Sequence, residues 1–519
     1  MNILNSIVSS YTSQGNPVPQ TRVTPKMVNP TSVSKTSVFY INDLHGQIPK
    51  MQRLVSASNH AGVLARQNGV DLLRVSSGDT FIGKDEKRNY VAASFLNIAK
   101  IDAEAPGNHE FDITASICGN LLKNSNTKIL GMNINFPDNN SELSKKVMRS
   151  TIQTADSGEK YGIIGVQPSD IGERLKNKTI LEGITIDDKE QTIYELQQEV
   201  IKLQSQGVNK IFLLSHEGNT VEREIAQRVS GIDVIFGGHS HDLIEGVVQG
   251  ENLFYSPTGE PVVITQAGRD GNKFGMLNLE FNDKGQISYV QNNVIDTNVY
   301  NPDLVMTKTV DSVLGKSPVI GNLGHLDPIP KNNLLEENPW ADFVADAVKN
   351  DLDSEIVLIN SANFRGSVDC GVVTERDIQS IFPFNNKLFK VRLSEEDLVD
   401  AVKKCAKSLI AKNSKPGILQ VSGITYKLDK SGNLLEMSYV DKQGKAHSID
   451  VNDPDDDKYY VTVYDEFLVG GGDGLDMLKR DDDEIIERYS FDKDKCTIDY
   501  IKTLEQPFSV RKDGRIQIV

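Results

Sequence analysis

The sequence predicts an α/β protein with two domains. Apolar segments of strand length alternate with segments of helical periodicity along most of the chain, and polar residues often follow the apolar segments directly. A chain of 519 residues is also too long for one hydrophobic core, so two domains are expected. The pattern weakens between residues 301 and 330, where Pro302, Pro318, Pro328 and Pro330 fall, and we place the domain junction there.

Composition excludes several classes of protein. Hydrophobic residues make up 38% and charged residues 25% of the chain, as in water-soluble globular proteins. No segment approaches the roughly 18–20 consecutive apolar residues that span a bilayer. With a net charge of −16 and a pI of about 5.1, the chain is unsuited to holding a nucleic-acid polymer by its backbone. A small anion could still bind locally, at a metal ion or an arginine.

The first 35 residues are rich in Ser, Thr, Asn and Pro, and we expect them to form a disordered leader. They lack the basic start and the long apolar block of a secretion signal, so the cytoplasm is the default expectation for localisation. The four cysteines are widely spaced and form no Cys-x-x-Cys pair, so we expect free thiols rather than a disulfide framework.

In the first block, strands and helices are expected in a regular order. Helices are expected at Met51–Gln67, Tyr90–Ala99 and Asp187–Gln206, the last with an acidic start that suits a helix N-terminus. The later strands are not separated by helices, so we expect mixed sheets or two sheets. The expected strands are Thr36–Asn42, Asp71–Ser76, Lys128–Asn133, Lys160–Val166, Lys210–Leu214, Asp233–Phe236, Pro261–Gln266, Met276–Phe281 and Ile287–Val290.

The second block also reads as α/β. Helices are expected at Pro339–Lys349, with a proline in its first turn, and at Glu396–Leu409. A hairpin is expected across Asp429-Lys430-Ser431-Gly432. The expected strands are Glu355–Ile359, Gly423–Leu428, Leu434–Val440 and Tyr459–Tyr464.

Polar residues that can bind a metal follow five strands or turns of the first block. Open α/β sheets form their clefts at the carboxyl ends of strands, so these residues are expected to meet. Five of the eight histidines lie in these stretches, all before residue 242, which is what a metal site produces. The stretches are Asp43-Leu44-His45-Gly46, Gly78-Asp79, Gly107-Asn108-His109-Glu110-Phe111-Asp112, Ser215-His216-Glu217 and Gly237-Gly238-His239-Ser240-His241.

These stretches together predict a hydrolytic centre with two metal ions. Imidazoles and carboxylates are the ligands that a pair of divalent ions needs, with one carboxylate shared. A lone Asp-x-His is usually a surface loop and Gly-Asp alone carries almost no information, so the prediction depends on all five occurring in this order. The candidate ligands are Asp43, His45, Asp79, Asn108, His216, His239 and His241.

His109 and Asp112 are the candidate catalytic residues. A histidine can donate a proton near neutral pH, and a carboxylate three residues later can hold the imidazole in one tautomer. No serine or cysteine lies in a nucleophile motif, so no covalent intermediate is expected.

The order of these stretches resembles that of the calcineurin-like metallophosphoesterases. The length and the second block narrow the resemblance to the two-domain 5′-nucleotidase family, which includes bacterial UDP-sugar hydrolases, over roughly Val38 to Leu478. The resemblance implies an N-terminal αββα sandwich with mixed sheets at residues 36–298, a linker at 299–335 and a C-terminal α/β substrate-binding domain at 336–519.

The resemblance also implies roles for the candidate residues. Asp43, His45, Asp79 and His241 would hold one divalent ion, and Asp79, Asn108, His216 and His239 the other, with Zn or Mn as candidates. Asp79 would bridge the two ions. A water activated by both ions would attack phosphorus, while His109, oriented by Asp112, stabilises the growing charge or assists the leaving group.

The second block offers candidates for binding a nucleotide. A guanidinium matches phosphate or ribose oxygens, and phenylalanine rings can stack on a base, although such rings at strand ends are more often part of a core. The family resemblance favours the binding role. It has gaps, since Pro339 stands where several nucleotidases carry arginine, and Ala-Asn-Phe precedes the arginine where glycines are common. The candidates are Asn360, Arg365, Phe384, Phe467 and Asp473.

The favoured function is a metal-dependent 5′-nucleotidase acting on a small nucleotide. The alternatives within the family are a 2′,3′-cyclic-nucleotide phosphodiesterase and a nucleotide-sugar hydrolase. Members of this family are often periplasmic or extracellular. An alternative of another class is an inactive nucleotide-binding or surface-interaction protein. The sequence leaves the preferred base, the metal and the oligomeric state open.

Overall fold

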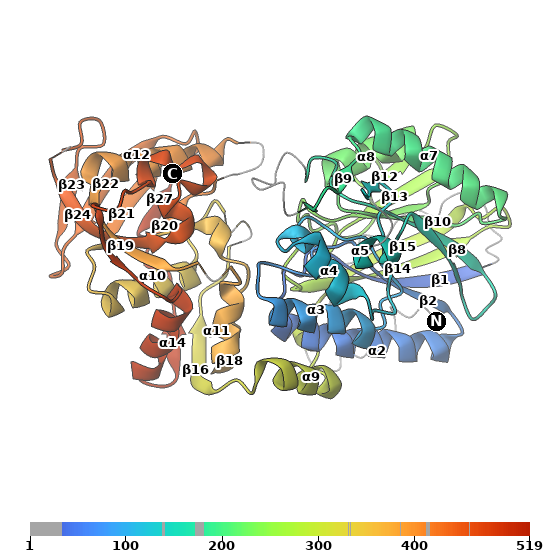
Figure 1. The fold of residues 1–519 in the computed structure, drawn as a ribbon, viewed down its shortest axis with the longest axis horizontal. Helices are drawn as coiled ribbons and strands as arrows, with labels where there is room; N and C mark the ends of the chain where they lie inside the picture. Colours follow the sequence, from blue (N-terminus) through green and yellow to red (C-terminus); the bar gives the residue numbers. More distant parts are fainter. Residues whose placement is uncertain are drawn as a thin grey trace. The chain divides into compact units, whose positions relative to one another are not determined.

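The computed structural model describes residues 34–137, 141–171, 181–330, 332, 334–384, 386–411, 416–455 and 457–519. The chain divides into two compact units, Met1–Lys316 and Ser317–Val519 (Figure 1). This boundary falls inside the segment expected as a linker, 299–335, which itself forms helix α9 (Leu304–Leu314) and strand β16 (Val319–Leu326). The expected leader lies outside the described residues, except for Ser34 and Lys35, with which the first strand begins.

Unit 1 contains two mixed β-sheets. The first has, in spatial order, β15 (Ile287–Asp296), β14 (Lys273–Phe281), β1 (Ser34–Ile41), β2 (Asp71–Ser76), β3 (Ala103–Glu104), β4 (Lys128–Leu130) and β6 (Val147–Met148). The second has β12 (Leu253–Tyr255), β13 (Pro261–Thr265), β11 (Val234–Phe236), β10 (Ile211–Ser215), β8 (Lys160–Val166) and β7 (Ser150–Thr154). In the first sheet β1 is parallel to β2 and antiparallel to β14, and in the second β11 is parallel to β10 and β13.

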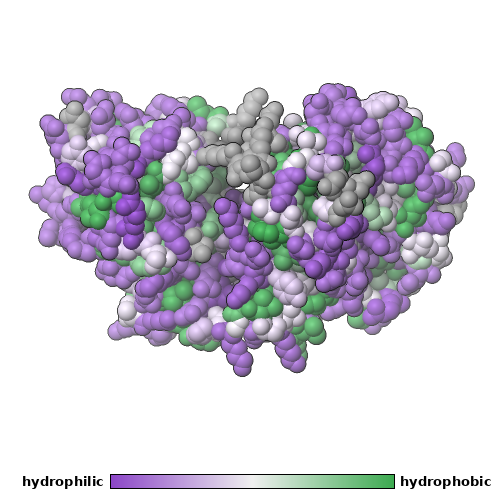
Figure 2. Space-filling view, in the orientation of Figure 1, coloured by the Kyte–Doolittle hydropathy of each residue, from purple (hydrophilic) through white to green (hydrophobic). Residues whose placement is uncertain are grey.

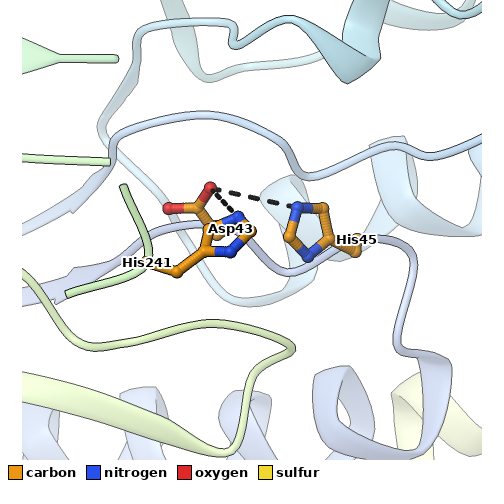
Figure 3. Close-up of side chains that lie close together, drawn as sticks. All are labelled: Asp43, His45 and His241. Carbon is orange, nitrogen blue, oxygen red and sulfur yellow. Dashed lines mark ion pairs between the residues drawn. The ribbon is translucent and has the colours of Figure 1, made fainter. Parts of the chain in front are cut away.

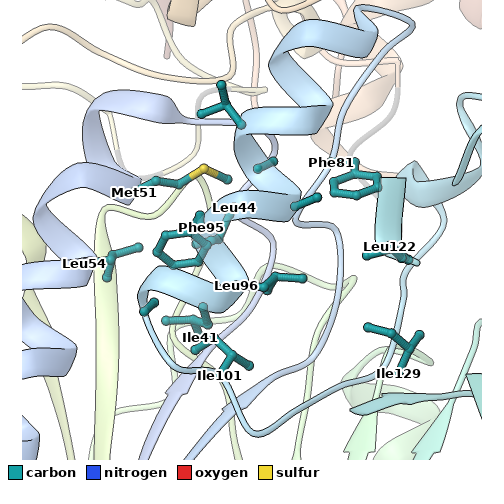
Figure 4. Packing of buried hydrophobic residues seen from close by; sticks show 14 of the residues in the cluster. Ile41, Leu44, Met51, Leu54, Phe81, Phe95, Leu96, Ile101, Leu122 and Ile129 are labelled. Carbon is teal, nitrogen blue, oxygen red and sulfur yellow. The ribbon is translucent and has the colours of Figure 1, made fainter. Parts of the chain in front are cut away.

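The two sheets pack on each other, and helices cover their outer faces. Tyr40 of β1 packs against Phe236 of β11 in the apolar layer between the sheets. Figure 1 shows α2 (Ile48–Asn68) and α3 (Glu86–Ile98) on one side of the strands, and α7 (Lys189–Ser205) and α8 (Asn219–Arg228) on the other. In the outer layer, Phe95 and Leu96 of α3 lie near Ile41 of β1 (Figure 4). This confirms the expected αββα sandwich with mixed sheets.

The boundaries of the helices follow local chemistry. The α3 helix begins at Glu86, four residues before the expected start, because the Asp85 carboxylate accepts from the Lys87 and Arg88 amides and caps the helix. The α2 helix begins at Ile48 with a proline in its first turn and ends at Asn68, where Gly69, with a φ of 61°, caps it. Shorter elements of unit 1 are α4 (Ala115–Leu122), α5 (Glu142–Lys146), and the paired strands β5 (Ile134–Asn135) and β9 (Thr185–Ile186).

Unit 2 has a central five-stranded sheet. Its order is β20 (Leu419–Ser422), β17 (Ile356–Asn360), β24 (Tyr459–Asp465), β19 (Leu388–Ser394) and β25 (Ile485–Arg488). Ile356 and Leu358 face one apolar cluster, while Val357 and Ile359 face another, so both faces of β17 are covered. The helices are α10 (Pro339–Asp351), α11 (Glu375–Ile381), α12 (Glu395–Ala406), α13 (Glu466–Val469) and α14 (Lys493–Thr503).

Two smaller sheets complete unit 2 as an α/β domain. One has the order β23 (Ala446–Ile449), β22 (Leu434–Val440), β21 (Ile424–Leu428) and β27 (Ile516–Ile518), and contains the expected hairpin. The other has β18 (Gly371–Thr374), β16 and β26 (Phe508–Val510).

The surface and the cysteines agree with the composition. The face in Figure 2 is mostly hydrophilic, with hydrophobic patches between the charged side chains. None of the helices in the described ranges combines the length and apolar character needed to cross a bilayer. All four cysteines are free thiols, three of them buried and Cys370 exposed, which confirms the prediction.

Candidate metal centre

The predicted metal ligands follow the carboxyl ends of parallel strands in both sheets of unit 1. The positions are Asp43 and His45 after β1, Asp79 after β2, Asn108 after β3, His216 after β10, and His239 and His241 after β11. Parallel pairing of β1 with β2 and of β10 with β11 brings these ends to one edge of each sheet. Residues separated by almost 200 positions in the sequence therefore meet, as the sequence predicts.

Asp43 lies among three imidazoles. Its Oδ1 atom is 3.3 Å from Nε2 of His241, 3.8 Å from Nε2 of His216 and 3.9 Å from Nε2 of His45. Figure 3 shows the rings of His45 and His241, which come from different loops, beside the same carboxylate. Three nitrogens around one carboxylate oxygen form a set of ligand atoms of the kind that divalent cations bind.

Asp79 uses its two oxygens differently. Its Oδ1 atom accepts a hydrogen bond from the backbone N–H of His109 at 2.8 Å. Its Oδ2 atom lies 3.1 Å from Nε2 of His216 and 3.4 Å from Nε2 of His45. Nearby, Oδ1 of Asn108 and Nδ1 of His239 are 2.8 Å apart. Asp79 therefore stands between two imidazoles that the family resemblance would assign to different ions.

The ligand loops have an unusual backbone. Asp43, His45, Asp79, His239 and His241 all have positive φ angles, between 48° and 69°. This left-handed conformation costs on the order of 1–3 kcal/mol for a residue other than glycine and is typical of functional sites. Backbone hydrogen bonds from Asp43 to Gly78 (2.9 Å) and from His45 to Asp79 (2.7 Å) hold two of these loops together.

Glycine is required where the loops approach the ligands. A Cβ atom on Gly107 would lie 2.2 Å from Oδ1 of Asp79 and 2.6 Å from Nε2 of His216. A Cβ atom on Gly238 would lie 2.7 Å from Nδ1 of His216. Any side chain at either position would displace a predicted ligand.

Two residues that the sequence analysis did not single out fix the imidazoles. Nδ1 of His45 lies 2.8 Å from Oδ1 of Asp270, and Nδ1 of His216 lies 2.5 Å from the carbonyl oxygen of Ser77. With Nδ1 donating in both rings, Nε2 is directed toward Asp43 and Asp79. Asp270 could have been found, because it follows β13 at the same edge of the sheet as the other ligands.

Glu110 also has a role that the sequence analysis missed, although it lies inside the central hexapeptide. Its buried carboxylate accepts from the backbone N–H groups of Gly107 (2.6 Å), Phe81 (2.9 Å) and Asp79 (3.0 Å). It therefore ties the loop after β3 to the loop after β2.

Comparison with known proteins identifies the two units. Residues 36–243 match the family model of the calcineurin-like phosphoesterases, and residues 315–480 match that of the 5′-nucleotidase C-terminal domain. The chain therefore combines a calcineurin-like phosphoesterase domain with a 5′-nucleotidase C-terminal domain. It is therefore a phosphoester hydrolase of the metallophosphoesterase type, and the family implies divalent metal ions.

Similar proteins cover most of the chain. Bovine 5′-nucleotidase (Bos taurus) is 26% identical over 543 residues, which cover 93% of this chain and 90% of that protein. The trifunctional nucleotide phosphoesterase protein YfkN of Bacillus subtilis (strain 168) is 25% identical over 93% of this chain, which spans 35% of its length. The crystal structure of the 5′-nucleotidase precursor from Thermus thermophilus has the same fold, with a TM-score of 0.68, 21% identity, and 93% and 99% of the two chains covered.

The predicted catalytic pair is also assembled. Nδ1 of His109 lies 2.7 Å from Oδ2 of Asp112, which in turn accepts from the Gly83 amide at 2.7 Å. The imidazole is 16% exposed, so it remains accessible. His109 also forms a compact group with His45 and Asp79, with ligand atoms within 4.8 Å of one another. The geometry therefore permits His109 to act as a proton donor beside the centre or as a ligand.

The donors of the centre fit divalent cations. Two further compact groups are Asp43 with His45 and His241, and Asp43 with Asp79 and His216. The buried Nε2 atom of His216 faces Oδ2 of Asp79 at 3.1 Å and Oδ1 of Asp43 at 3.8 Å. Burial favours its neutral form, but Asp79 and Asp43 raise the pKa of His216 to about 10, while burial lowers the pKa of His241 to about 4. Buried imidazoles and carboxylates at this spacing suit divalent metal ions.

In unit 2, the structure brings some of the substrate candidates together. The guanidinium of Arg365 lies 5.3 Å from the centre of the Phe384 ring. Asn360 ends β17 and is buried, and its Oδ1 accepts from Nδ2 of Asn363 at 2.9 Å. Phe467 lies in α13, where it is partly buried and packs against Gly472 and an apolar cluster of unit 2.

Asp473 follows Gly472, with a φ of 56°. Asp473 therefore adjoins the glycine that contacts the ring of Phe467.

Proposed function

We propose that this protein is a metal-dependent 5′-nucleotidase that releases phosphate from small nucleotides. The observation that carries the proposal is the meeting of seven predicted metal ligands and the His109–Asp112 pair at one edge of the sheets, in a chain that also has a 5′-nucleotidase C-terminal domain. The similarity to bovine 5′-nucleotidase over 93% of the chain supports the same activity.

The ligand set would hold two divalent ions. Asp43, His45, Asp79 and His241 would hold one, and Asp79, Asn108, His216 and His239 the other, with Asp79 shared. When bound, such ions supply Lewis acidity toward the phosphoryl oxygens and lower the pKa of a water.

The chain's own residues act on the substrate around this centre. His109 donates a hydrogen bond or a proton where negative charge grows, and Asp112 holds its ring so that Nε2 is directed outward. Asp270 and Ser77 keep His45 and His216 in the tautomer whose Nε2 is available. Attack by water requires no covalent intermediate on the chain.

Unit 2 would select the nucleotide. Arg365 and Asn360 would bind phosphate or ribose oxygens, Phe384 and Phe467 would stack on the base, and Asp473 would accept from a base amino group. The similarity to a trifunctional nucleotide phosphoesterase favours a second candidate, an enzyme that acts on several nucleotide phosphoesters. For this candidate, 2′,3′-cyclic nucleotides and nucleotide sugars are the substrates to try.

A phosphate-release screen tests both candidates. The protein is assayed with nucleoside mono-, di- and triphosphates, 2′,3′-cyclic nucleotides and nucleotide sugars, with Mn²⁺ or Zn²⁺ added and with chelator as the blank. We expect the highest kcat/KM for a nucleoside 5′-phosphate, and no release by Asp79→Asn. Release mainly from cyclic nucleotides or nucleotide sugars supports the second candidate. No release from any of them by metal-loaded protein contradicts both.

A further inference from the structure

A group of carboxylates lies in unit 2, within one compact domain and apart in sequence from the metal centre. Glu337, Asp342 and Asp513 each offer one oxygen, and these oxygens lie within 4.8 Å of one another. Glu337 shortly precedes α10, Asp342 lies in the first turns of α10, and Asp513 lies in the turn between β26 and β27. The group therefore joins the start of a helix to the last turn of the chain.

Asp342 is the unusual member of this group. Its side chain is 1% exposed, and among the described residues no N–H or hydroxyl group donates to either of its oxygens, while the carboxyl group of Glu337 lies within hydrogen-bonding reach. The nearest ion pair is with Nε of Arg515, 3.8 Å from Oδ1, which is too long for a hydrogen bond. An ionised carboxylate in this position is costly unless a cation lies beside it.

Arg515 does not supply that cation alone, because its donors are used by other carboxylates. Its Nη1 and Nη2 atoms donate to Asp346 at 2.8 and 2.9 Å, and its Nε and Nη2 atoms donate to Asp513 at 2.8 and 2.6 Å. Asp342, Asp346 and Asp513 therefore share one guanidinium. The combined negative charge of these carboxylates, when ionised, exceeds the single positive charge of Arg515.

The backbone of the last turn holds one oxygen of Glu337. Oε1 of Glu337 accepts from the N–H groups of Gly514 and Arg515, both at 3.0 Å. These bonds hold the Asp513–Arg515 turn against Glu337. Burial raises the pKa of Asp342 to about 9, so without a bound cation this group keeps a proton at neutral pH.

We propose that Glu337, Asp342 and Asp513 bind a divalent cation with a preference for oxygen ligands, Ca²⁺ foremost. All three ligands are carboxylates, and the group contains no histidine or cysteine, which favours Ca²⁺ over Zn²⁺. Asp513 is exposed, so a cation can enter and water can complete its coordination. The site is independent of the proposed phosphate chemistry.

The expected effect of this cation is structural. The turn that contains Asp513 leads directly into β27, which pairs with β21 through Tyr426 and Ile516. A cation held by this turn and by α10 would fasten the final strand to the helix. Binding to the folded state alone raises stability by mass action, so Ca²⁺ should raise the melting temperature of unit 2.

The only tryptophan of the chain gives a readout specific for this site. Trp340 lies in α10, two residues before Asp342. Tb³⁺ replaces Ca²⁺ at oxygen sites and emits when a nearby tryptophan is excited. We expect tryptophan-sensitised Tb³⁺ emission from the full-length protein, and Ca²⁺ should reverse it with a Kd on the order of 10⁻⁵–10⁻³ M.

The decisive comparison uses Asp342→Asn, which keeps the shape of the side chain and removes its charge. We expect the Tb³⁺ emission of this variant to be at least tenfold lower than that of wild type. The variant should also lose the Ca²⁺-dependent rise in Tm, which for wild type should be on the order of 5 °C at a Ca²⁺ concentration of 100 times the Kd. Without Ca²⁺ the variant should be at least as stable as wild type. Asp453→Asn, in an exposed acidic run, is the matched control and should behave as wild type.

The alternative is that Asp342 is simply a protonated, buried carboxyl. In that case wild type shows no tryptophan-sensitised emission, or Asp342→Asn keeps the emission and the Ca²⁺ response, and either result overturns the proposal. Glu337→Gln gives a second test, since it should weaken Tb³⁺ emission without changing the buried Asp342. Phosphate release should be unchanged in both variants.

Discussion

Nδ1 of His45 lies 2.8 Å from Oδ1 of Asp270, a carboxylate 225 residues later in the chain. Both side chains are almost fully buried, and they follow strands of different sheets, β1 and β13. Since the Nδ1–H of His45 is committed to Asp270, Nε2 faces Asp43 and Asp79. The orientation of a predicted ligand therefore depends on a residue from a distant loop.

Asp270→Ala should lower the metal affinity of the centre about 10–100-fold, because carboxylates that hold a ligating histidine typically contribute this much. The measurement is the activity as a function of Mn²⁺ concentration, together with the metal retained after dialysis. Asp283→Ala changes an exposed aspartate in the turn between β14 and β15 and serves as the control. Unchanged metal dependence in Asp270→Ala would show that His45 needs no orienting partner.

Asp79→Asn should reduce turnover by several orders of magnitude, because one oxygen of Asp79 faces the imidazoles assigned to both ions. Asparagine can still accept the His109 N–H bond through its amide oxygen, so the fold should be kept. Metal content per chain and kcat are measured on the same sample, with circular dichroism as the control for folding. Near-normal activity, in this variant or in metal-free wild type, would contradict the two-ion proposal.

His109→Ala should lower kcat about 10²–10³-fold while leaving the metal content nearly intact. The reason is that His109 is oriented by Asp112 and remains partly exposed beside the centre. Asp112→Asn should give a smaller loss, because it removes the orienting charge and keeps the imidazole. Loss of a metal ion from His109→Ala would instead identify His109 as a ligand, a role that its distance to His45 and Asp79 also permits.

Local sequence patterns predict much of the fold. The strands Asp71–Ser76 and Lys160–Val166 have the predicted bounds because each is a short apolar run ended by turn residues. Helix α9 was missed, although Asp303 caps it by accepting from the Val305 and Met306 amides. The prolines around this segment predicted a linker, although Asp303 is a residue type that favours the N-terminus of a helix.

The residues of the candidate site were also predicted only in part. Ligands such as His216 and His239 were found because each follows an apolar strand within a few residues. Asp270 and Ser77 were missed because their bonds to histidines cross between loops far apart in sequence. Side-chain spacing also gives no sign of the left-handed backbone at Asp43, which depends on tertiary contacts.

Asp233→Asn should change the pH dependence of stability. Burial raises the pKa of Asp233 well above that of an ordinary aspartate, although the Ile211 N–H donates to it at 2.8 Å. The unfolded chain loses this proton near pH 4, whereas the folded chain keeps it, so unfolding releases a proton and stability falls as pH rises above about 4. Asparagine keeps an acceptor and removes this effect.

The Tm difference between Asp233→Asn and wild type should therefore become more favourable to the variant from pH 5 to pH 7. Both proteins are measured metal-free, so that the metal centre does not add its own pH dependence. A Tm difference that is the same at both pH values would mean that Asp233 is ionised in the fold.

Phe384→Ala should separate nucleotide selection from phosphate chemistry. Arg365 lies against this ring, and all seven predicted ligands of the metal centre lie in unit 1. Removing one stacking ring should cost on the order of 1–3 kcal/mol in nucleotide binding. para-Nitrophenyl phosphate has no ribose and a smaller ring, so its kcat/KM should fall much less than that of a nucleoside monophosphate.

Phe467→Ala gives the same test with a complication that a control resolves. Phe467 packs against Gly472 and the apolar cluster of unit 2, so its loss also lowers stability. Phe389→Ala, in β19, removes a ring from the same cluster that no substrate role involves, and should affect both substrates equally. If Phe467→Ala also affects both equally, Phe467 supports the fold only. A loss confined to the nucleotide, absent from Phe389→Ala, would assign the base to this ring.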